Sequence, residues 1–528
     1  MDRQTLSNYG WIVCSLVVLA ILIALATPFA TAVADSVMKT TQIMENTSFQ
    51  KWEESVPFEV IELEARYDFS FYNSLNAAVN DANNDTTANA NATKETAVAA
   101  IYHNENGDTI IVLLKDTTEN SLMYINRDMT LKLGGKCLNL GSGAGFQIPD
   151  TVDAVVVDGR LNGSKIQKNA TGTSVVADEF LFKVYCTKFT VRGGTYISNV
   201  GTVSNRNYVF SIDGGPTSYF EDCTIEASSV SGNTRALQSK GSLTLLNSKI
   251  KVNGGNEAMA VYIITEGKVS NCKIATDNGI SNIAGVYISK NTNATITNCD
   301  INAVCRPNST MASGIYLAET STATVTNCDI FADATCGDGN KNVSTGINSF
   351  GTLYVNDCDI FGTHSGVNVK GPTYINKGVY KGSGHGGIYF SNSNAEAYVE
   401  NATIGIVSYQ GLFKEEYDTT FYGASAIYIG GDSRQNIKVY INNCQLINRY
   451  PTTGSDGRGY AIVLRGSGSE ANNTVYLSNT KINATAATPI RVDNNTLKVY
   501  AGQNTNITAN MASMPGQVEF TNEIYIPN

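Results

Sequence analysis

The sequence predicts an all-β protein, a right-handed parallel β-helix solenoid of about ten to twelve coils with an N-terminal α/β cap. Two recurring phrases, with no helical period between them, support this fold class. The first phrase reads KVSNCKIAT, ATITNCDIN, ATVTNCDIF and LYVNDCDIF. Its cysteines, Cys272, Cys299, Cys328 and Cys358, recur about every 30 residues, a period that indicates a solenoid with one coil per repeat.

The second phrase precedes each cysteine and includes AVYII at 260–264, GVYIS at 285–289 and GIYLA at 314–318. Apolar residues alternate with outward residues, which is the pattern of a strand with one buried face. Each repeat is therefore expected to hold at least two short strands separated by tight bends. Equivalent strands of successive coils would pair in parallel, about 4.8 Å apart. A right-handed sense is expected because parallel crossovers are overwhelmingly right-handed.

Asparagine precedes the cysteine in three of these repeats, at Asn271, Asn298 and Asn327. Asparagine tolerates the left-handed backbone conformation better than most residues, so a bend is predicted at each of these positions. Stacked asparagine side chains would then hydrogen-bond to one another along the solenoid.

The repeat cysteines are predicted to form a buried ladder, joined by Cys223 and Cys444 at the equivalent positions. A buried cysteine behaves as a small hydrophobic residue, and side chains stacked in register point the same way, which disfavours disulfides. Cys305 and Cys336 instead follow their repeat cysteines in loops of adjacent coils. An exported protein could oxidise that pair, and the sequence leaves this open.

These repeats resemble those of the pectate-lyase-like right-handed β-helix superfamily, over roughly residues 126–510. The resemblance implies the fold of a stacked parallel β-helix. It does not imply one activity, because this superfamily includes lyases, hydrolases, phage tailspikes and surface adhesins.

Residues 1–34 are expected to be a signal peptide or a membrane anchor. Trp11 to Ala26 is almost wholly apolar, Pro28 follows, and a small-x-small cleavage motif ends at Ala34. If uncleaved, Trp11 to Val33 is long enough to span a bilayer, and this segment would then be the only membrane contact. Both alternatives export the rest of the chain.

Residues 35–60 are expected to be a spacer and residues 61–125 a cap over the first coil. In the cap, a helix is predicted with Leu75, Ala78 and Val79 on one face. Residues 81–96 are too polar to pack and are expected to form a loop. A cap is needed because the first coil would otherwise expose apolar core and unpaired strand edges. At the other end, residues 511–528 are predicted to hold a closing strand.

The composition agrees with export. Charged residues are 16% of the chain, against about 25% in typical proteins, and the net charge is −10. Glycine and small polar residues dominate, as expected of a turn-rich structure. With no basic cluster, nucleic-acid binding is not expected. An extracellular or cell-surface location is therefore predicted.

Three residues are weak catalytic candidates, His364, His385 and Asp359. The segment SGHGG at 383–387 resembles the Gly-His-Gly of polygalacturonase-type hydrolases, but the clustered aspartates and the Arg-Ile-Lys of that family are missing. The repeat alignment places His364 and His385 next to each other in one turn. Polar turn residues are the simpler interpretation, and a two-histidine metal or pH-sensitive site is the alternative.

Asp300, Asp329 and Asp359 are predicted to stack outward on three successive coils. Such a like-charge ladder is destabilising unless it is solvated or bridged by a cation, and carboxylate oxygens favour calcium. Lys273 occupies the same position one coil earlier, so a solvated ladder ending in a salt bridge is the simpler interpretation. No cofactor is therefore expected, and calcium is the alternative.

An outward tyrosine stripe is the predicted ligand-binding surface. The strand phrases place these residues on one face, interrupted by Asn348 and Asn368: Tyr262, Tyr287, Tyr316, Tyr389 and Tyr428. Tyrosine combines an apolar ring with a polar tip, which suits stacking against sugar rings. Stabilisation of the cross-strand ladder alone is the competing interpretation.

The sequence thus predicts an exported, non-catalytic surface protein of the adhesin type, whose partner is an extracellular glycan or another surface. The main reason is that no convergent acid and base residues occur where this fold would need them. The alternative is a polysaccharide lyase or glycoside hydrolase with an unfamiliar site.

Overall fold

A computed structural model describes residues 67–521, apart from internal segments. The segments that are not described are 176–177, 306–310, 334–342, 383–384, 407–424, 430–434, 449–459, 465–471, 485–488, 493–497, 503 and 508–517. The predicted signal peptide or anchor, the spacer and Cys336 lie outside the described residues. Among the described residues, no helix is long and apolar enough to cross a membrane.

The described chain begins with β1 (Ser70–Tyr72), α3 (Leu75–Asn84), β2 (Ala99–His103) and β3 (Thr109–Leu113). Strands β1, β2 and β3 pair antiparallel, and α3 buries the predicted face of Leu75, Ala78 and Val79. Ser74 caps the helix by accepting a hydrogen bond from the Ala77 amide at 3.2 Å. The carboxylate of buried Glu119 also accepts one from the Leu75 amide, at 2.8 Å, where a helix start favours negative charge.

The loop predicted for residues 81–96 begins later than expected, because residues 81–84 form the last turn of α3. Asp81 is only 1% exposed. Its carboxylate accepts hydrogen bonds from the Asn89 amide at 2.8 Å and from the Asn89 side chain at 2.6 Å. A residue that appeared too polar to pack is thus buried because the following turn satisfies its oxygens.

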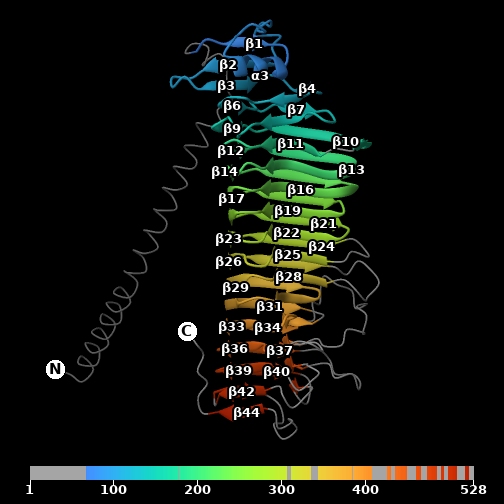
Figure 1. Ribbon diagram of the computed structural model, residues 1–528, viewed down its shortest axis with the longest axis vertical. Coiled ribbons are helices and arrows are strands. Elements are labelled where there is room, and N and C mark those ends of the chain that lie inside the picture. Colours follow the sequence, from blue (N-terminus) through green and yellow to red (C-terminus); the bar gives the residue numbers. More distant parts are fainter. Residues whose placement is uncertain are drawn as a thin grey trace, which may run out of the picture. The chain divides into compact units, whose positions relative to one another are not determined.

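After the cap, each coil contributes three short strands rather than the minimum of two that the sequence predicted. They fall into three parallel rows, here called A, B and C (Figure 1). Parallel pairing already begins where β3 meets the first strand of row A. The described strands therefore form one long, mostly parallel sheet that is consistent with a β-helix solenoid.

Row A continues from β3 through strands that pair in register with the strand one coil away. They are β6 (Met129–Lys132), β9 (Ala154–Gly159), β12 (Lys188–Gly193), β14 (Thr217–Glu221), β17 (Ser242–Leu246), β20 (Glu266–Ser270), β23 (Asn293–Thr297), β26 (Thr322–Thr326), the first parts of β29 (Thr352–Gly362) and β31 (Thr373–Gly382), β33 (Glu396–Glu400), β36 (Lys438–Asn442), β39 (Thr474–Ser478), β42 (Lys498–Gly502) and β44 (Val518–Thr521).

Row B follows row A around each coil and includes the strands after the repeat cysteines. They are β4 (Thr117–Glu119), β7 (Cys137–Leu140), β10 (Lys165–Val175), the first part of β13 (Thr195–Ile212), β15 (Thr224–Ser229), β18 (Lys249–Gly254), β21 (Lys273–Gly279), β24 (Asp300–Cys305), β27 (Asp329–Asp333), the last parts of β29 and β31, β34 (Thr403–Ile406), β37 (Gln445–Asn448), β40 (Lys481–Ala484) and β43 (Asn506–Ile507).

Row C completes the coil with the strands of the second phrase. They are β5 (Leu122–Tyr124), β8 (Gly145–Ile148), β11 (Glu179–Val184), the last part of β13, β16 (Ser231–Ser239), β19 (Glu257–Ile263), β22 (Asn282–Ile288), β25 (Met311–Leu317), β28 (Val343–Ser349), β30 (Ser365–Val369), β32 (Gly386–Phe390), β35 (Ile427–Ile429), β38 (Ile462–Leu464) and β41 (Ile490–Val492).

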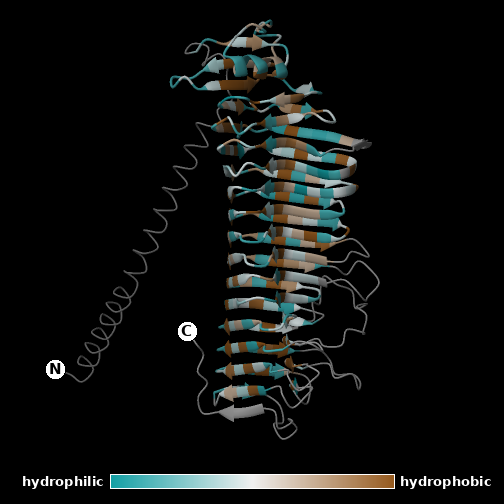
Figure 2. Ribbon diagram, in the orientation of Figure 1, coloured by the Kyte–Doolittle hydropathy of each residue, from teal (hydrophilic) through white to brown (hydrophobic). Residues whose placement is uncertain are grey.

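Most inward residues of the three rows form one large apolar core, and Ala170, Val200 and Val203 form a small separate cluster. The alternation of hydrophobic and hydrophilic residues along the strands is visible in Figure 2. Glycines within the row C strands allow neighbouring coils to approach each other. A Cβ on Gly314 would lie 2.3 Å from Ile330 Cγ2 and 2.7 Å from the Gly346 carbonyl oxygen of the next coil. The Gly that opens the second phrase is thus a packing requirement.

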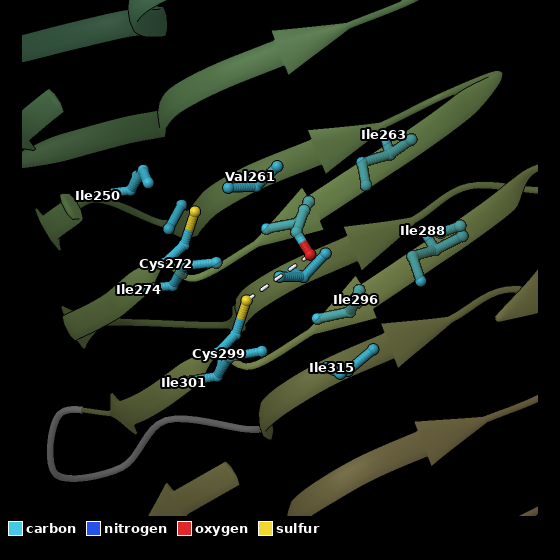
Figure 3. Packing of buried hydrophobic residues seen from close by; sticks show 14 of the residues in the cluster. Ile250, Val261, Ile263, Cys272, Ile274, Ile288, Ile296, Cys299, Ile301 and Ile315 are labelled. Carbon is cyan, nitrogen blue, oxygen red and sulfur yellow. Dashed lines mark hydrogen bonds between the residues drawn. The ribbon is translucent and has the colours of Figure 1, made fainter. Parts of the chain in front are cut away.

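The predicted cysteine ladder is present in the core. Cys272 and Cys299 lie on neighbouring coils among the inward isoleucines (Figure 3). The Cys299 amide points to the sulfur of Cys328 at 3.4 Å, and the Cys328 amide points to the sulfur of Cys358 at the same distance. These cysteines are buried thiols, as are Cys223 and Cys444. Cys305 is buried as well, and Cys336, whose pairing with it the sequence left open, is not described.

The predicted asparagine ladder is also confirmed. Asn271, Asn298 and Asn327 have φ angles of 55°, 54° and 51°, in the left-handed region. The side-chain amide of Asn298 donates to the Asn271 oxygen at 3.1 Å, and that of Asn327 donates to the Asn298 oxygen at 2.9 Å. Each bend therefore positions the side chain that hydrogen-bonds to the next bend.

Candidate functional site

The outward face of row C carries the predicted tyrosine stripe. Tyr262, Tyr287 and Tyr316 are register partners in β19, β22 and β25, and each is partly exposed. We call these three residues the row C stripe. They take this position because their neighbours Val261, Val286 and Ile315 point inward into the core.

Within the row C stripe, the rings cover one another. The rings of Tyr287 and Tyr316 stack with centroids 4.7 Å apart and an interplanar angle of 8°. Tyr262 makes an edge contact with Tyr287, with centroids 4.8 Å apart and an interplanar angle of 60°, and the Phe350 ring lies 5.5 Å from that of Tyr316. A ligand arriving from solvent therefore meets ring edges and hydroxyl groups. This differs from the stacking against sugar rings that was predicted, because the faces of Tyr287 and Tyr316 are turned toward each other along the solenoid.

A shallow hollow of about 90 Å³ lies against the row C stripe, lined by Tyr287, Tyr316, Met311 and Asn282 among others. Burial raises the pKa of Tyr287 to about 12. Its phenol is therefore protonated at neutral pH and can both donate and accept hydrogen bonds there.

The two asparagines that interrupt the tyrosines are buried. The Asn368 side-chain amide donates to the Asn348 oxygen at 3.1 Å, and Ser391 donates to the Asn368 oxygen at 2.6 Å. Beyond them, Tyr389 is partly exposed, whereas Tyr428 is only 3% exposed. Solvent does not reach the ring of Tyr428, because Tyr389 and His385 cover it at centroid distances of 5.5 and 4.9 Å. Of the five predicted binding tyrosines, it is the one that the fold hides.

The structure brings His364 and His385 together, with ring centroids 4.3 Å apart. Tyr389 contacts both rings, at 5.4 and 4.9 Å. Burial lowers the pKa of His364 well below its usual value, and the neighbouring His385 and Lys370 lower it further. His364 is therefore neutral at pH 7.

Asp359, the third weak catalytic candidate, belongs to row B and is not part of this histidine pair. It faces outward from row B, where its carboxylate is 3.9 Å from the ammonium of Lys381. Asp300, Asp329 and Asp359 are register partners there and are all exposed. Among the described residues, no group of three or more His, Cys, Asp or Glu side chains could hold a metal ion.

Row A carries a second and more regular series of tyrosines that we did not predict as a site. Neighbouring centroids are 4.8–5.3 Å apart, and interplanar angles range from 4° to 13°. We call this series the row A ladder: Tyr354, Tyr374, Tyr398, Tyr440, Tyr476 and Tyr500. The sequence signal was present, because these tyrosines occupy one position in successive copies of the first phrase.

A second hollow on row C, of about 260 Å³, was not predicted. It is lined by side chains of β11, β13 and β16 and the residues next to them, including Lys183, Tyr185, Arg206, Asp213 and Gln238. Gln238 is the register partner of Tyr262, so the hollow adjoins the row C stripe. The pairing register shifts between Thr202 and Arg206, as in a β-bulge. Because that coil departs from the repeat, the repeat pattern could not indicate the hollow.

Comparison with known proteins leaves the resemblance to the pectate-lyase-like superfamily as a prediction. No protein-family model matches the sequence, and no curated protein or solved structure is detectably similar to it. What can be concluded about function therefore rests on the residues and geometry of row C.

Proposed function

We propose that this chain is an exported, non-catalytic surface protein that binds an extracellular glycan along the outward face of row C. The observation that carries the proposal is the row C stripe, in which the phenols of Tyr287 and Tyr316 border a hollow. Phenol hydroxyls donate and accept hydrogen bonds, as sugar hydroxyls do, and the ring edges offer apolar contact. Export rests on the apolar segment at Trp11 to Ala26 and on the low charge content.

The proposal includes the finer features of the fold. We infer a right-handed solenoid of about ten to twelve coils, since parallel crossovers are right-handed with few exceptions. We also infer membership of the pectate-lyase-like superfamily, in its non-catalytic branch. Successive coils about 4.8 Å apart would present equivalent groups to successive parts of an extended chain.

The test is a glycan array probed with the full-length chain and with Tyr287→Ala/Tyr316→Ala. Losing two hydrogen-bonding phenols at about 0.5–1.5 kcal/mol each should raise the Kd for a bound glycan roughly 5- to 150-fold. The matched control is Tyr354→Ala/Tyr374→Ala, which removes a similarly stacked pair from row A, with centroids 4.9 Å apart. Its glycan binding should equal that of the unaltered chain.

Equal binding by the row C variant and the unaltered chain would show that the row C stripe is only structural. The non-catalytic part needs a separate assay against pectins, alginate and glycosaminoglycans. Release of unsaturated or reducing ends, lost in His385→Ala, would replace the binding proposal by the alternative of a lyase or hydrolase.

A further inference from the structure

The larger hollow on row C gathers basic side chains in a chain whose net charge is −10. Three basic residues line it, Lys183, Arg206 and Lys240, together with two acidic ones, Asp178 and Asp213. The two acids do not neutralise the three bases, so the lining keeps a positive balance. The hollow is thus a local exception to the acidic character of the chain.

One basic and one acidic residue of the lining already form an ion pair with each other. Lys240 and Asp213 form an ion pair at 2.9 Å. Asp213 also accepts hydrogen bonds from Ser211 at 2.9 Å and from the Gln238 amide at 3.4 Å. Asp213 is therefore satisfied, and its charge is offset by Lys240.

The other two cations, Lys183 and Arg206, are less engaged, although the Arg206 guanidinium hydrogen-bonds the Tyr208 side chain and lies near Asp178. Neither Lys183 nor Arg206 forms an ion pair within 4 Å of an acidic group in the described part of the chain. The Lys183 ammonium lies 6.0 and 5.8 Å from the ring centroids of Phe180 and Tyr185, which line the same hollow. Two cations beside aromatic rings suit an anionic group attached to a ring-shaped ligand.

Asp178 indicates that the ligand also carries a hydrogen-bond donor. Its Oδ1 atom is buried and has no hydrogen-bond partner among the described residues. A buried carboxylate oxygen without a donor is costly, and a hydroxyl group of the ligand would satisfy it. The hollow thus calls for a ligand that carries both negative charge and hydroxyl groups.

We propose that this hollow is a binding site for an anionic group, a carboxylate, sulfate or phosphate, carried on a hydroxylated ligand of the size of one sugar unit. Its volume of about 260 Å³ is just below the range of roughly 300–1,000 Å³ that encloses drug-sized ligands. The site is separate from the row C stripe. It would stand even if the tyrosines bound nothing.

Buried contacts beside the hollow keep its walls in place. Arg235 is 8% exposed, and its guanidinium bonds Gln238, lies 3.4 Å from the Glu257 carboxylate and covers the Tyr262 ring at 4.4 Å. On the other side, Lys168 and Glu179 form an ion pair in which both side chains are 1% exposed. These groups are fixed, so the hollow is preformed and requires little ordering on binding.

Calorimetric titration of the full-length chain with glucuronate, glucose 6-sulfate, glucose 6-phosphate and glucose tests the proposal. At least one anionic sugar should bind tenfold or more tightly than glucose, and its affinity should fall as salt is added. The three anions identify which charged group the site prefers. Equal affinity for glucose and for all three anions would overturn the proposal.

Variants locate the binding. Lys183→Gln/Arg206→Gln should raise the Kd of the preferred anionic sugar at least tenfold. Lys249→Gln, an exposed lysine on row B, should leave it unchanged. Asp178→Ala should lower the preference for the sugar over acetate, because acetate has no hydroxyl group to lose. An unchanged Kd in the double variant, with an unchanged thermal transition, would place the anion elsewhere.

The two proposals fail in different ways. One outcome is that anionic sugars bind through Lys183 and Arg206 while glycan binding survives the loss of Tyr287 and Tyr316. That outcome refutes only the role of the row C stripe. A chain that binds neutral glycans through those tyrosines, with no preference for charge, refutes only the anion site.

Discussion

The two tyrosine series show how one residue type, stacked on the same solenoid, produces two different surfaces. The row A ladder is uninterrupted from Tyr354 to Tyr500, with nearly parallel rings. The row C stripe ends at buried Asn348, mixes edge and face contacts and adjoins two hollows. Regular stacking needs only a repeated tyrosine. Where the row is irregular, as in row C, hollows lie between the side chains, and a ligand can bind there.

Tyrosine content alone therefore does not indicate a binding site. In row A each tyrosine ring stacks on the next one, and such cross-strand pairs stabilise a sheet without any ligand. On row C, the cation of Arg235 replaces a further ring next to Tyr262, and Gln238 and Lys183 continue the row toward the larger hollow. The positions where the repeat is interrupted are therefore the better candidates for a binding site.

The largest expected effect tests whether both series face outward. Ile315→Ala, next to Tyr316 but 0% exposed, should lower the free energy of unfolding by about 2–5 kcal/mol through lost burial and a cavity. Ile441→Ala, next to Tyr440 in row A, should cost a similar amount for the same reason. Urea unfolding followed by circular dichroism measures both. A greater loss from Tyr316→Ala than from Ile315→Ala would invert the assigned strand phase.

The next effect separates ladder members by their number of ring neighbours. Tyr398→Ala loses stacked contacts at 5.3 and 4.8 Å, and should cost about 1–3 kcal/mol at roughly 0.5–1.5 kcal/mol per pair. Tyr500→Ala loses the single described contact with Tyr476, at 5.3 Å, and should cost about half as much. The shift of the thermal midpoint measures both. Equal costs would mean that stacking contributes little and that burial of each ring alone determines stability.

Much of the fold could be predicted from the sequence because the same strand and bend pattern recurs in many repeats. The alternation around Ile315, the left-handed bend at Asn298 and the inward Cys299 each recur coil after coil. The prediction of at least two strands per coil did not resolve the third, because the residues of row B follow the cysteine directly and two strands appeared as one motif. In β29, Thr352–Gly362, the structure itself joins them into one strand.

The candidate site was less predictable, because its features depart from the repeat. Arg206 follows a register shift, and Asp178 and Lys183 belong to a coil that lacks the cysteine phrase. The pair of His364 and His385 could be predicted, since both precede their strand glycine by the same number of residues. The burial of Tyr428 could not, because a two-residue alternation does not show what covers an outward position.

The smallest expected effect is a dependence of stability on pH that should occur in row C and not in row A. His364 has a pKa well below 6.5 in the folded chain because it is buried, beside His385 and Lys370. In the unfolded chain its pKa returns to about 6.5. Below that pH the unfolded state binds a proton that the folded state excludes, so stability falls as the pH falls, until the folded pKa is reached.

Between pH 6.5 and 5.5 this difference should cost about 1 kcal/mol, within the limit of roughly 1.4 kcal/mol per pH unit for one proton. Other groups titrate in the same range, so the quantity to compare is the change with pH in the unaltered chain and in His364→Gln. The variant should lose this part of the dependence, whereas His103→Gln, at an exposed cap residue, should keep it. Hydrogen exchange would place the loss in β30 and β32, with β36 and β39 of the row A ladder less affected. The same pH slope in His364→Gln and in the unaltered chain would mean that His364 is protonated in the folded state as readily as in the unfolded one, and that row C is no more pH-sensitive than row A.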